Sequence, residues 1–167
     1  ALSYFELALD YQPGHLIAGS NIAVILRKLG YLPASEKILR AEAEREHARK
    51  YALPQLGLTL MAMGRYEEAV TVFEEAVEIQ PHRVTIWNNY GTALEATGRL
   101  DEARQAFNYC LMMEPGWTLP HCNAAMVYAK LGDYDAALLY LDWLQDKAAG
   151  SRWALRGHEA AGDIHVI

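Results

Sequence analysis

Apolar residues recur along this chain with the spacing of one face of an α-helix, in short blocks that glycine interrupts. The clearest block, residues 84–97, has its apolar stripe at Trp87, Tyr90, Gly91 and Leu94. These positions are i, i+3, i+4 and i+7, which predicts an amphipathic helix. Gly98 follows and can adopt the left-handed conformation that ends a helix. A second stripe predicts a second helix before Pro115, at Ala103, Phe107, Cys110 and Leu111.

The same helix pair returns along the chain, because five columns of residues keep one 34-residue register. Glycine forms one column, at Gly30, Gly64, Gly98 and Gly132. Small residues form two columns, Ala23, Gly57, Gly91 and Ala125, and Ser35, Ala69, Ala103 and Ala137. Larger apolar residues form two more, Leu26, Leu60, Leu94 and Tyr128, and Leu39, Phe73, Phe107 and Leu141. A fixed period of this length indicates a repeat array in which neighbouring units bury each other's apolar faces.

The spacing and the residue types resemble the tetratricopeptide repeat. One unit carries the full signature, at Trp87, Tyr90, Gly91, Leu94, Gly98, Ala103, Phe107 and Pro115. The resemblance implies an all-α fold, a right-handed superhelical solenoid of antiparallel helix pairs. We expect a half-repeat at 1–15, full repeats at 16–49, 50–83, 84–117 and 118–151, and a capping helix or a truncated next repeat at 152–167. The leading half-repeat predicts that the parent protein extends further toward its N-terminus.

The repeat at 16–49 departs most from the signature. Gly19 stands at the tryptophan position, Glu42 at a normally small position and His47 at the proline position. We expect the charged run RAEAEREHARK, residues 40–50, to extend the second helix of this repeat. Prolines are expected close to the first turn of a helix, where their missing N–H costs nothing; they are Pro33, Pro54 and Pro120.

The resemblance also implies a concave groove, lined by the first helix of each repeat, that binds an extended peptide. An amide recurs there in every repeat, at Asn21, Gln55, Asn89 and Asn123. This column is similar to the asparagine ladder of the superhelical domain of O-linked N-acetylglucosamine transferase. A primary amide both donates and accepts, so it can pair with a peptide backbone without reading its side chains. The alternative is that these amides bond a neighbouring helix.

Further groove candidates share the face opposite the predicted core. They are Asn88, Thr92, Tyr51, Leu58, Met126, Arg27 and Lys28. Because Trp87, Tyr90 and Gly91 are assigned to the core, we expect Asn88 and Asn89 on the other side of the helix. Four neutral hydrogen bonds contribute about 2–6 kcal/mol, whereas micromolar binding needs about 8 kcal/mol. Specificity must therefore come from the other groove side chains or from further repeats.

Composition excludes several other functions. The net charge of −6 argues against a nucleic-acid partner, and no apolar run is long enough to predict a membrane span. The six histidines are scattered without a metal-binding or HExxH spacing, so we expect no metal, cofactor or catalytic site. Two cysteines fit a reducing compartment, although an exported protein can also lack disulfides. A lysine and arginine clamp for a terminal carboxylate is excluded, because its positions hold Thr85, Asn88, Pro54 and Leu119.

The resemblance therefore predicts a non-catalytic scaffold or adaptor whose partner is a protein or peptide, in the assembly of a bacterial multiprotein complex. Two alternatives remain open at this point. The chain can be the repeat region of a larger enzyme, such as a glycosyltransferase, with its chemistry elsewhere. It can also self-associate through the exposed ends of the array, since an unpaired helix at residues 1–10 would leave an apolar face uncovered.

Overall fold

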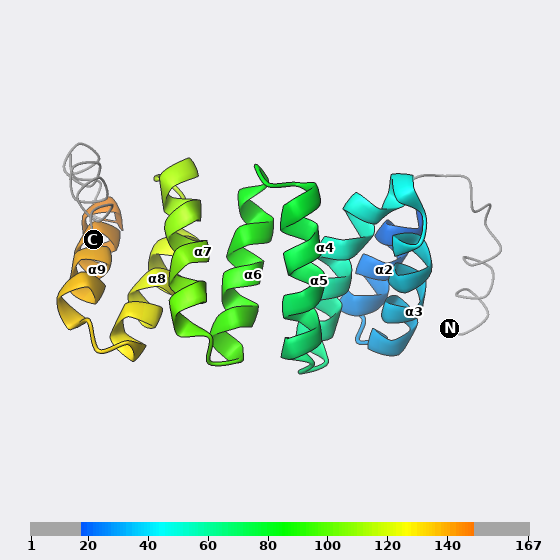
Figure 1. Cartoon of the computed structure of the whole chain (residues 1–167), viewed down its shortest axis with the longest axis horizontal. Coiled ribbons are helices and arrows are strands. Elements are labelled where there is room, and N and C mark those ends of the chain that lie inside the picture. Colours follow the sequence, from blue (N-terminus) through cyan, green and yellow to red (C-terminus); the bar gives the residue numbers. More distant parts are fainter. Residues whose placement is uncertain (1–17, 149–167) are drawn as a thin grey trace. The chain divides into compact units, whose positions relative to one another are not determined.

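The computed structural model describes residues 18–148, and all regular structure in that range is α-helical. The helices are α2 (Ala18–Lys28), α3 (Leu32–Ala43), α4 (Glu46–Ala62), α5 (Tyr66–Ile79), α6 (Val84–Ala96), α7 (Leu100–Met113), α8 (Thr118–Lys130) and α9 (Tyr134–Ala148). Within each of the two units described below, consecutive helices pack against each other, and Figure 1 shows them running antiparallel. The all-α fold of helix pairs is confirmed; the predicted segments at 1–15 and 152–167 lie outside the described residues.

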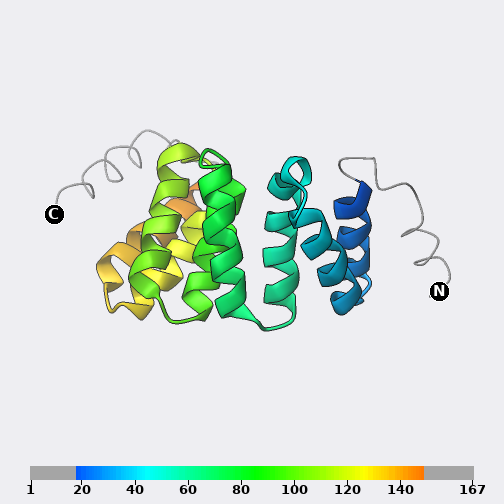
Figure 2. The ribbon, with the colours of Figure 1, turned by 45° about the vertical axis from the view of Figure 1, so that its right-hand side comes forward.

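The chain divides into two compact units. The first spans Ala1–His82 and contains α2 to α5, and the second spans Arg83–Ile167 and contains α6 to α9. Within each unit the first helices of consecutive repeats also touch, α2 against α4 and α6 against α8. Figure 2 shows the helices of both units from a second side. Each unit is therefore a stack of two repeats, and the boundary between the units lies within two residues of a predicted repeat boundary.

Glycine ends the first helix of every described repeat. Gly30, Gly64, Gly98 and Gly132 have φ angles of 82°, 75°, 79° and 84°. A side chain is strained in this left-handed region, so glycine is the residue that reverses the chain here at low cost. The prediction that these glycines terminate helices is confirmed.

The small-residue columns let the two helices of a repeat approach closely. A Cβ atom added to Gly57 would lie 2.5 Å from the Phe73 ring, and one added to Gly91 would lie 2.7 Å from the Phe107 ring. Both phenylalanines are completely buried. The glycine therefore makes the space that the ring fills, as the repeat pattern indicates.

In the divergent first repeat, two departures from the signature compensate for each other. A Cβ atom added to Gly19 would lie 2.7 Å from Glu42, at the carboxyl end of that side chain. Glu42 thus occupies space that a tryptophan would otherwise take, and its carboxylate pairs with Arg45 at 3.1 Å. A large residue at the small position is tolerated because the facing position has no side chain.

The charged run at 40–50 does not extend one helix, and this prediction was wrong. Helix α3 ends at Ala43, and α4 begins at Glu46 after Arg45 adopts an extended conformation. Since the following helix starts early, Pro54 lies inside α4 and not near its start. Proline cannot donate to the carbonyl four residues before it. The side-chain amide of Gln80 donates to this carbonyl, that of Lys50, at 2.6 Å.

One member of the large apolar columns differs from its counterparts. Leu39, Phe73 and Phe107 are completely buried, whereas Leu141 is 44% exposed. Leu141 belongs to α9, the last helix in residues 18–148, so no described helix packs on its outer side. Burial of this column thus depends on the next helix of the array.

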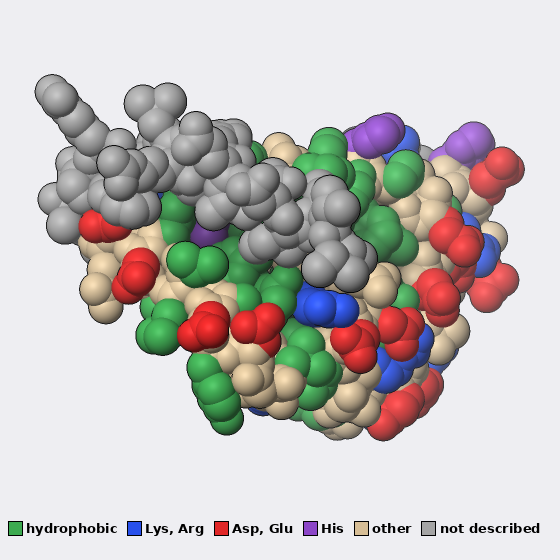
Figure 3. Space-filling view, turned by 60° about the vertical axis from the view of Figure 1, so that its left-hand side comes forward, with side chains coloured by type: hydrophobic (Ala, Val, Ile, Leu, Met, Phe, Trp, Pro, Cys, Tyr) green, Lys and Arg blue, Asp and Glu red, His purple; other side chains and the backbone are tan. Residues whose placement is uncertain are grey.

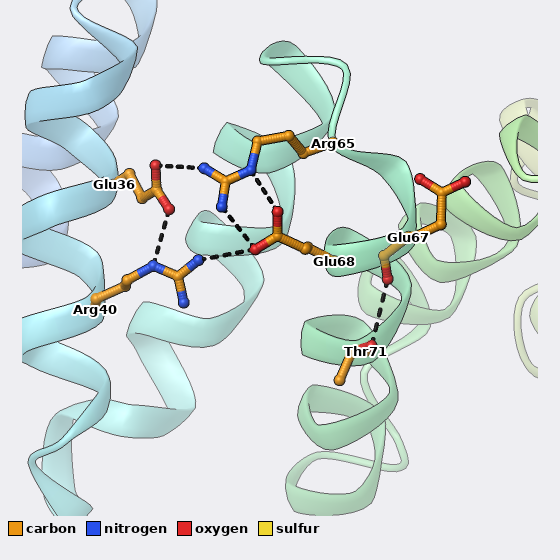
Figure 4. Close-up of polar contacts among 6 residues, drawn as sticks. All are labelled: Glu36, Arg40, Arg65, Glu67, Glu68 and Thr71. Carbon is orange, nitrogen blue, oxygen red and sulfur yellow. Dashed lines mark hydrogen bonds and ion pairs between the residues drawn. The ribbon is translucent and has the colours of Figure 1, made fainter.

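The outer helices of the first unit are joined by a closed ring of charges (Figure 4). Glu36 accepts from Arg40 at 2.8 Å and from Arg65 at 2.7 Å, and Glu68 accepts from the same two arginines. Burial alone would raise the pKa of Glu36, but the hydrogen bonds from Arg40 and Arg65 lower it below its ordinary value. Two arginines and two glutamates neutralise each other, so this ring links α3 to the start of α5 and offers no charge to a ligand.

Candidate functional site

Two surfaces contain the predicted binding residues, one in each unit. The α2–α4 face comprises Asn21, Arg27, Lys28, Tyr51, Gln55 and Leu58. The α6–α8 face comprises Asn88, Asn89, Thr92, Asn123 and Met126. In each case two first helices contact one another and present these residues. The two faces are described separately below.

On the α6–α8 face, two predicted residues are hydrogen-bonded to each other. The amide nitrogen of Asn123 on α8 donates to the amide oxygen of Asn88 on α6 at 3.0 Å. Asn88 is only 3% exposed, so the expectation that it lies on the open side of the helix was wrong. The reason is tertiary: α8 covers that side of α6, which the sequence of α6 alone does not reveal.

On the α2–α4 face, the corresponding contact is made by a cation and an amide. The Nη2 group of Arg27 on α2 donates to the side-chain oxygen of Gln55 on α4 at 3.2 Å. The Nε atom of Arg27 is buried and has no hydrogen-bond partner. Burial lowers the pKa of Arg27 from its ordinary value. The guanidinium is therefore partly desolvated, and its one hydrogen-bond partner in this face is a neutral group.

The amide column is thus divided between two roles. Gln55 and Asn123 bond the first helix that precedes them in their own unit, which is the alternative considered for the column. Asn21 is exposed and Asn89 is half-buried, and neither side chain makes a hydrogen bond with the described residues of its unit. The last two are consequently the column members whose donors and acceptors remain available to a ligand.

Apolar and aromatic side chains flank these amides. Met126 is 53% exposed, whereas Tyr51 and Leu58 are half-buried. The ammonium of Lys50 lies 5.1 Å from the centre of the Tyr51 ring, at a distance typical of a cation–π contact. Thr92 is half-buried and donates its hydroxyl to the backbone oxygen of Asn88 at 2.9 Å, so it supports α6 locally.

An ion pair beside the α6–α8 face was not predicted from the sequence. Glu95 on α6 accepts from Lys130 on α8 at 2.8 Å, and the Glu95 side chain is 12% exposed. Glu95 aligns with Arg27 in the 34-residue register. Two features of the sequence indicate this pair. The charge in this column changes from Arg27 to Glu95, and Lys130 stands at the end of α8, the first helix of the following repeat.

An aromatic cluster between α8 and α9 was also missed. His121 is 6% exposed, and its ring stacks on that of Trp143 with centroids 3.5 Å apart. Its Nδ1 atom lies 2.8 Å from the backbone oxygen of Trp117. Burial lowers the pKa of His121, the contact with Trp117 opposes this, and the charge of Lys147 adds to the lowering. The neutral ring is therefore the form that packs here.

The described residues carry little that resembles catalytic chemistry. Burial raises the pKa of the Cys110 thiol to about 12, which leaves it protonated and inert. Cys122 is an exposed free thiol. Within residues 18–148, no three histidine, cysteine or acidic side chains come together to hold a metal ion. Over the same residues, no helix combines the length and the apolar character that crossing a bilayer would need.

The surface around α8 and α9 mixes apolar and acidic side chains. Figure 3 turns this side of the molecule forward and shows hydrophobic side chains at the surface between acidic ones. Leu138 and Leu139 on α9 are each 56% exposed, and Tyr134 is 67% exposed. These residues lie on the same helix as the exposed Leu141.

The repeats match known sequences. Two tetratricopeptide repeat family models match residues 55–111 and 120–142. A peroxisomal targeting signal receptor from Candida glabrata is 28% identical over 111 residues, 66% of this chain and 17% of the receptor. PYG7, a chloroplastic tetratricopeptide repeat domain-containing protein from Arabidopsis thaliana, is 34% identical over 97 residues, 56% of this chain and 32% of PYG7. The chain thus spans a third or less of these relatives.

Solved structures share the fold. MamA from Desulfovibrio magneticus RS-1 matches with a TM-score of 0.80 and 14% identity, over 90% of this chain and 85% of that one. MamA from AMB-1 matches with a TM-score of 0.76 and 21% identity, over 91% of this chain and 85% of that one. At these identities the likeness concerns the fold alone. The two family matches and the 34-residue register show that the chain is a tetratricopeptide repeat protein.

Proposed function

We propose that this chain is a non-catalytic interaction scaffold that binds an extended segment of a partner protein on the first-helix faces of its repeats. One observation carries the proposal. Asn21 and Asn89 occupy the same repeat position, are at least partly accessible, and make no side-chain hydrogen bond with the described residues of their units. A side-chain amide that recurs at one repeat position and has unused hydrogen-bond donors and acceptors is suited to pair with a peptide backbone.

The surroundings of these amides support the same function. The exposed Met126 and the half-buried Tyr51 and Leu58 provide apolar contact area, which neutral hydrogen bonds alone do not replace. One relative is, by its name, a receptor for a peroxisomal targeting signal. Assembly of a bacterial multiprotein complex stays a prediction from the sequence.

The test is selection of binders from a displayed library of twelve-residue peptides, followed by fluorescence anisotropy with a selected, labelled peptide. The double variant Asn21→Ala, Asn89→Ala removes the two unused amides. A peptide bound on one of the two faces loses one neutral hydrogen bond of about 0.5–1.5 kcal/mol, so its affinity should fall about 2- to 13-fold. The variant should unfold at the wild-type denaturant concentration, because neither amide supports its unit.

The matched control is Gln105→Ala, which removes an exposed amide from α7, a second helix. It should leave the affinity unchanged. Failure of the library to yield any binder would contradict the scaffold proposal. Binders that tolerate the double variant but lose affinity in Gln105→Ala would place the interaction on the other side of the repeats.

A second candidate function is favoured by another relative. Protein O-mannosyl-transferase TMTC1 from Homo sapiens is 27% identical over 128 residues, 77% of this chain and 14% of that protein. In this reading, the chain is the repeat region of a larger enzyme such as a glycosyltransferase. The complete open reading frame would decide: a catalytic domain outside these residues, with sugar transfer that depends on the repeats, would support it.

Self-association is the third reading. Tyr134, Leu138 and Leu141 give α9 an exposed apolar side in the described part of the chain. Light scattering over a hundredfold range of protein concentration tests it. A mass that stays at 18.7 kDa throughout would exclude self-association of this chain.

A further inference from the structure

We propose that the Arg27–Gln55 pair on the α2–α4 face is a binding site for a carboxylate, so that the segment bound there carries an acidic side chain. This inference rests on the proposed function and specifies the chemistry of the partner. Three independent features of the first unit support it: the pairing of its arginines, the hydrogen-bonding balance of the Arg27–Gln55 pair, and the distribution of acidic residues.

Arg27 differs from every other arginine in the described part of the first unit. Each of the others pairs with a glutamate in the same unit: Arg40 with Glu36, Arg45 with Glu42, Arg49 with Glu75 and Arg65 with Glu68. Arg27 reaches only the neutral oxygen of Gln55. Its Nε atom is buried without a partner, so water does not compensate for the missing acceptor. A partly desolvated cation without a counter-ion is stabilised when a carboxylate arrives.

The Arg27–Gln55 pair offers hydrogen-bond donors to a ligand, whereas its side-chain acceptor is already in use. Arg27 has only donors, and it already uses the oxygen of Gln55. What remains is the amide nitrogen of Gln55 and the accessible N–H groups of Arg27. A peptide backbone presents donors and acceptors in alternation, whereas a carboxylate presents acceptors alone. The pair is therefore better matched to a carboxylate than to a backbone amide.

No acidic residue of the α2–α4 face competes for this site. Helix α2 contains none, and neither does α4 from residue 51 onward. Among residues 18–82, the acidic side chains lie on α3, on α5 and at positions 44 and 46 between α3 and the first turn of α4. Lys28 is exposed and follows Arg27 directly. The face is therefore positive although the chain as a whole has a net charge of −6.

The α6–α8 face provides the contrast. At the position of Arg27 it has Glu95, which is neutralised by Lys130 at 2.8 Å. Its amides pair with each other, Asn123 with Asn88, and retain one donor group and one acceptor. Charge selection is therefore assigned to the first unit alone.

The test compares two fluorescein-labelled nine-residue peptide pools that are identical except for the central residue, glutamate in one and glutamine in the other. All other positions hold mixtures of uncharged residues. The wild-type chain should bind the glutamate pool about tenfold more tightly at low salt, and added salt should reduce this preference. Arg27→Gln should abolish the preference, and Arg27→Lys should retain part of it.

Lys37→Gln is the matched control, because it removes an exposed cation from α3, a second helix outside the α2–α4 face, and should keep the preference. Far-UV circular dichroism verifies that each variant is folded. Equal binding of both pools by the wild type, or a preference that survives Arg27→Gln, would overturn the carboxylate site while leaving the scaffold function standing. Absence of binding to either pool at any concentration would overturn both.

Discussion

The two units of this chain repeat the same helix pair, yet their neighbouring first helices meet through different chemistry. In the second unit, Asn123 donates to the buried Asn88, and Lys130 neutralises Glu95. In the first unit, the cation Arg27 meets the neutral Gln55. The two units share the register but differ at one or two positions. In the second unit the contacting side chains satisfy each other's hydrogen bonds and charges, whereas in the first unit hydrogen-bond donors remain unused. Repeat position therefore predicts where a side chain lies better than what it does.

The largest expected difference between the units is in the loss of stability when an added methyl group is placed between the two helices of a repeat. Gly91→Ala places a Cβ atom 2.7 Å from the ring of the fully buried Phe107, so it should destabilise the second unit by about 2–3 kcal/mol. Gly19→Ala meets only the end of the flexible Glu42 side chain. Its better helix propensity, about 0.5–1 kcal/mol, should offset the small shift that Glu42 must make.

Urea denaturation with two probes measures this difference. All four tryptophans follow His82 in the sequence and thus belong to the second unit. Tryptophan fluorescence therefore reports that unit, whereas far-UV circular dichroism reports both. Equal destabilisation by the two substitutions would show that Glu42 is as rigid as Phe107 and would refute the compensation described for the first repeat.

The next effect concerns the contacts between first helices. Asn123→Ala leaves the oxygen of Asn88 buried without its donor, which should cost the second unit about 1–2 kcal/mol. Gln55→Ala removes a partner from Arg27, which keeps some exposure to water, so the first unit should lose less. Denaturation followed by the same two probes compares them. If Asn123→Ala has no effect, Asn88 does not depend on this bond.

The helix pairs and their terminating glycines could be predicted from the sequence, because a period of 3.6 residues and a glycine that ends a helix are local signals. The burial of Asn88 could not, since it depends on α8, which begins thirty residues later. The pairing of Arg27 with Gln55 also joins two repeats. The break between α3 and α4 was misplaced because the usual proline is replaced by His47 and alternating charges fit either helix.

The smallest expected effect is the dependence on pH that His121 gives to the stability of the second unit. The pKa of His121 is lowered in the folded chain from its ordinary value of 6.5, mainly by burial. Below pH 6.5 the unfolded state therefore binds more protons than the folded state, and stability falls as the pH decreases further. His121→Phe keeps a ring against Trp143 and should reduce this loss between pH 7 and pH 5.

The fluorescence-detected urea midpoint, measured at several pH values, checks the histidine. His82→Gln is the control, because His82 is exposed and should leave the pH dependence of the wild type intact. A His121→Phe variant that loses stability as steeply as the wild type would show that other groups are responsible.

The central claim is that partner segments bind the first-helix faces and that the first unit selects an acidic side chain. Nuclear magnetic resonance tests it most directly, through the side-chain signals of asparagine, glutamine and arginine during titration with the glutamate peptide pool. We expect saturable shifts at Asn21, Gln55 and the Nε of Arg27, and much smaller shifts with the glutamine pool. Shifts confined to side chains of the second helices, such as Gln105, with none at Arg27 or Asn21, would contradict the account.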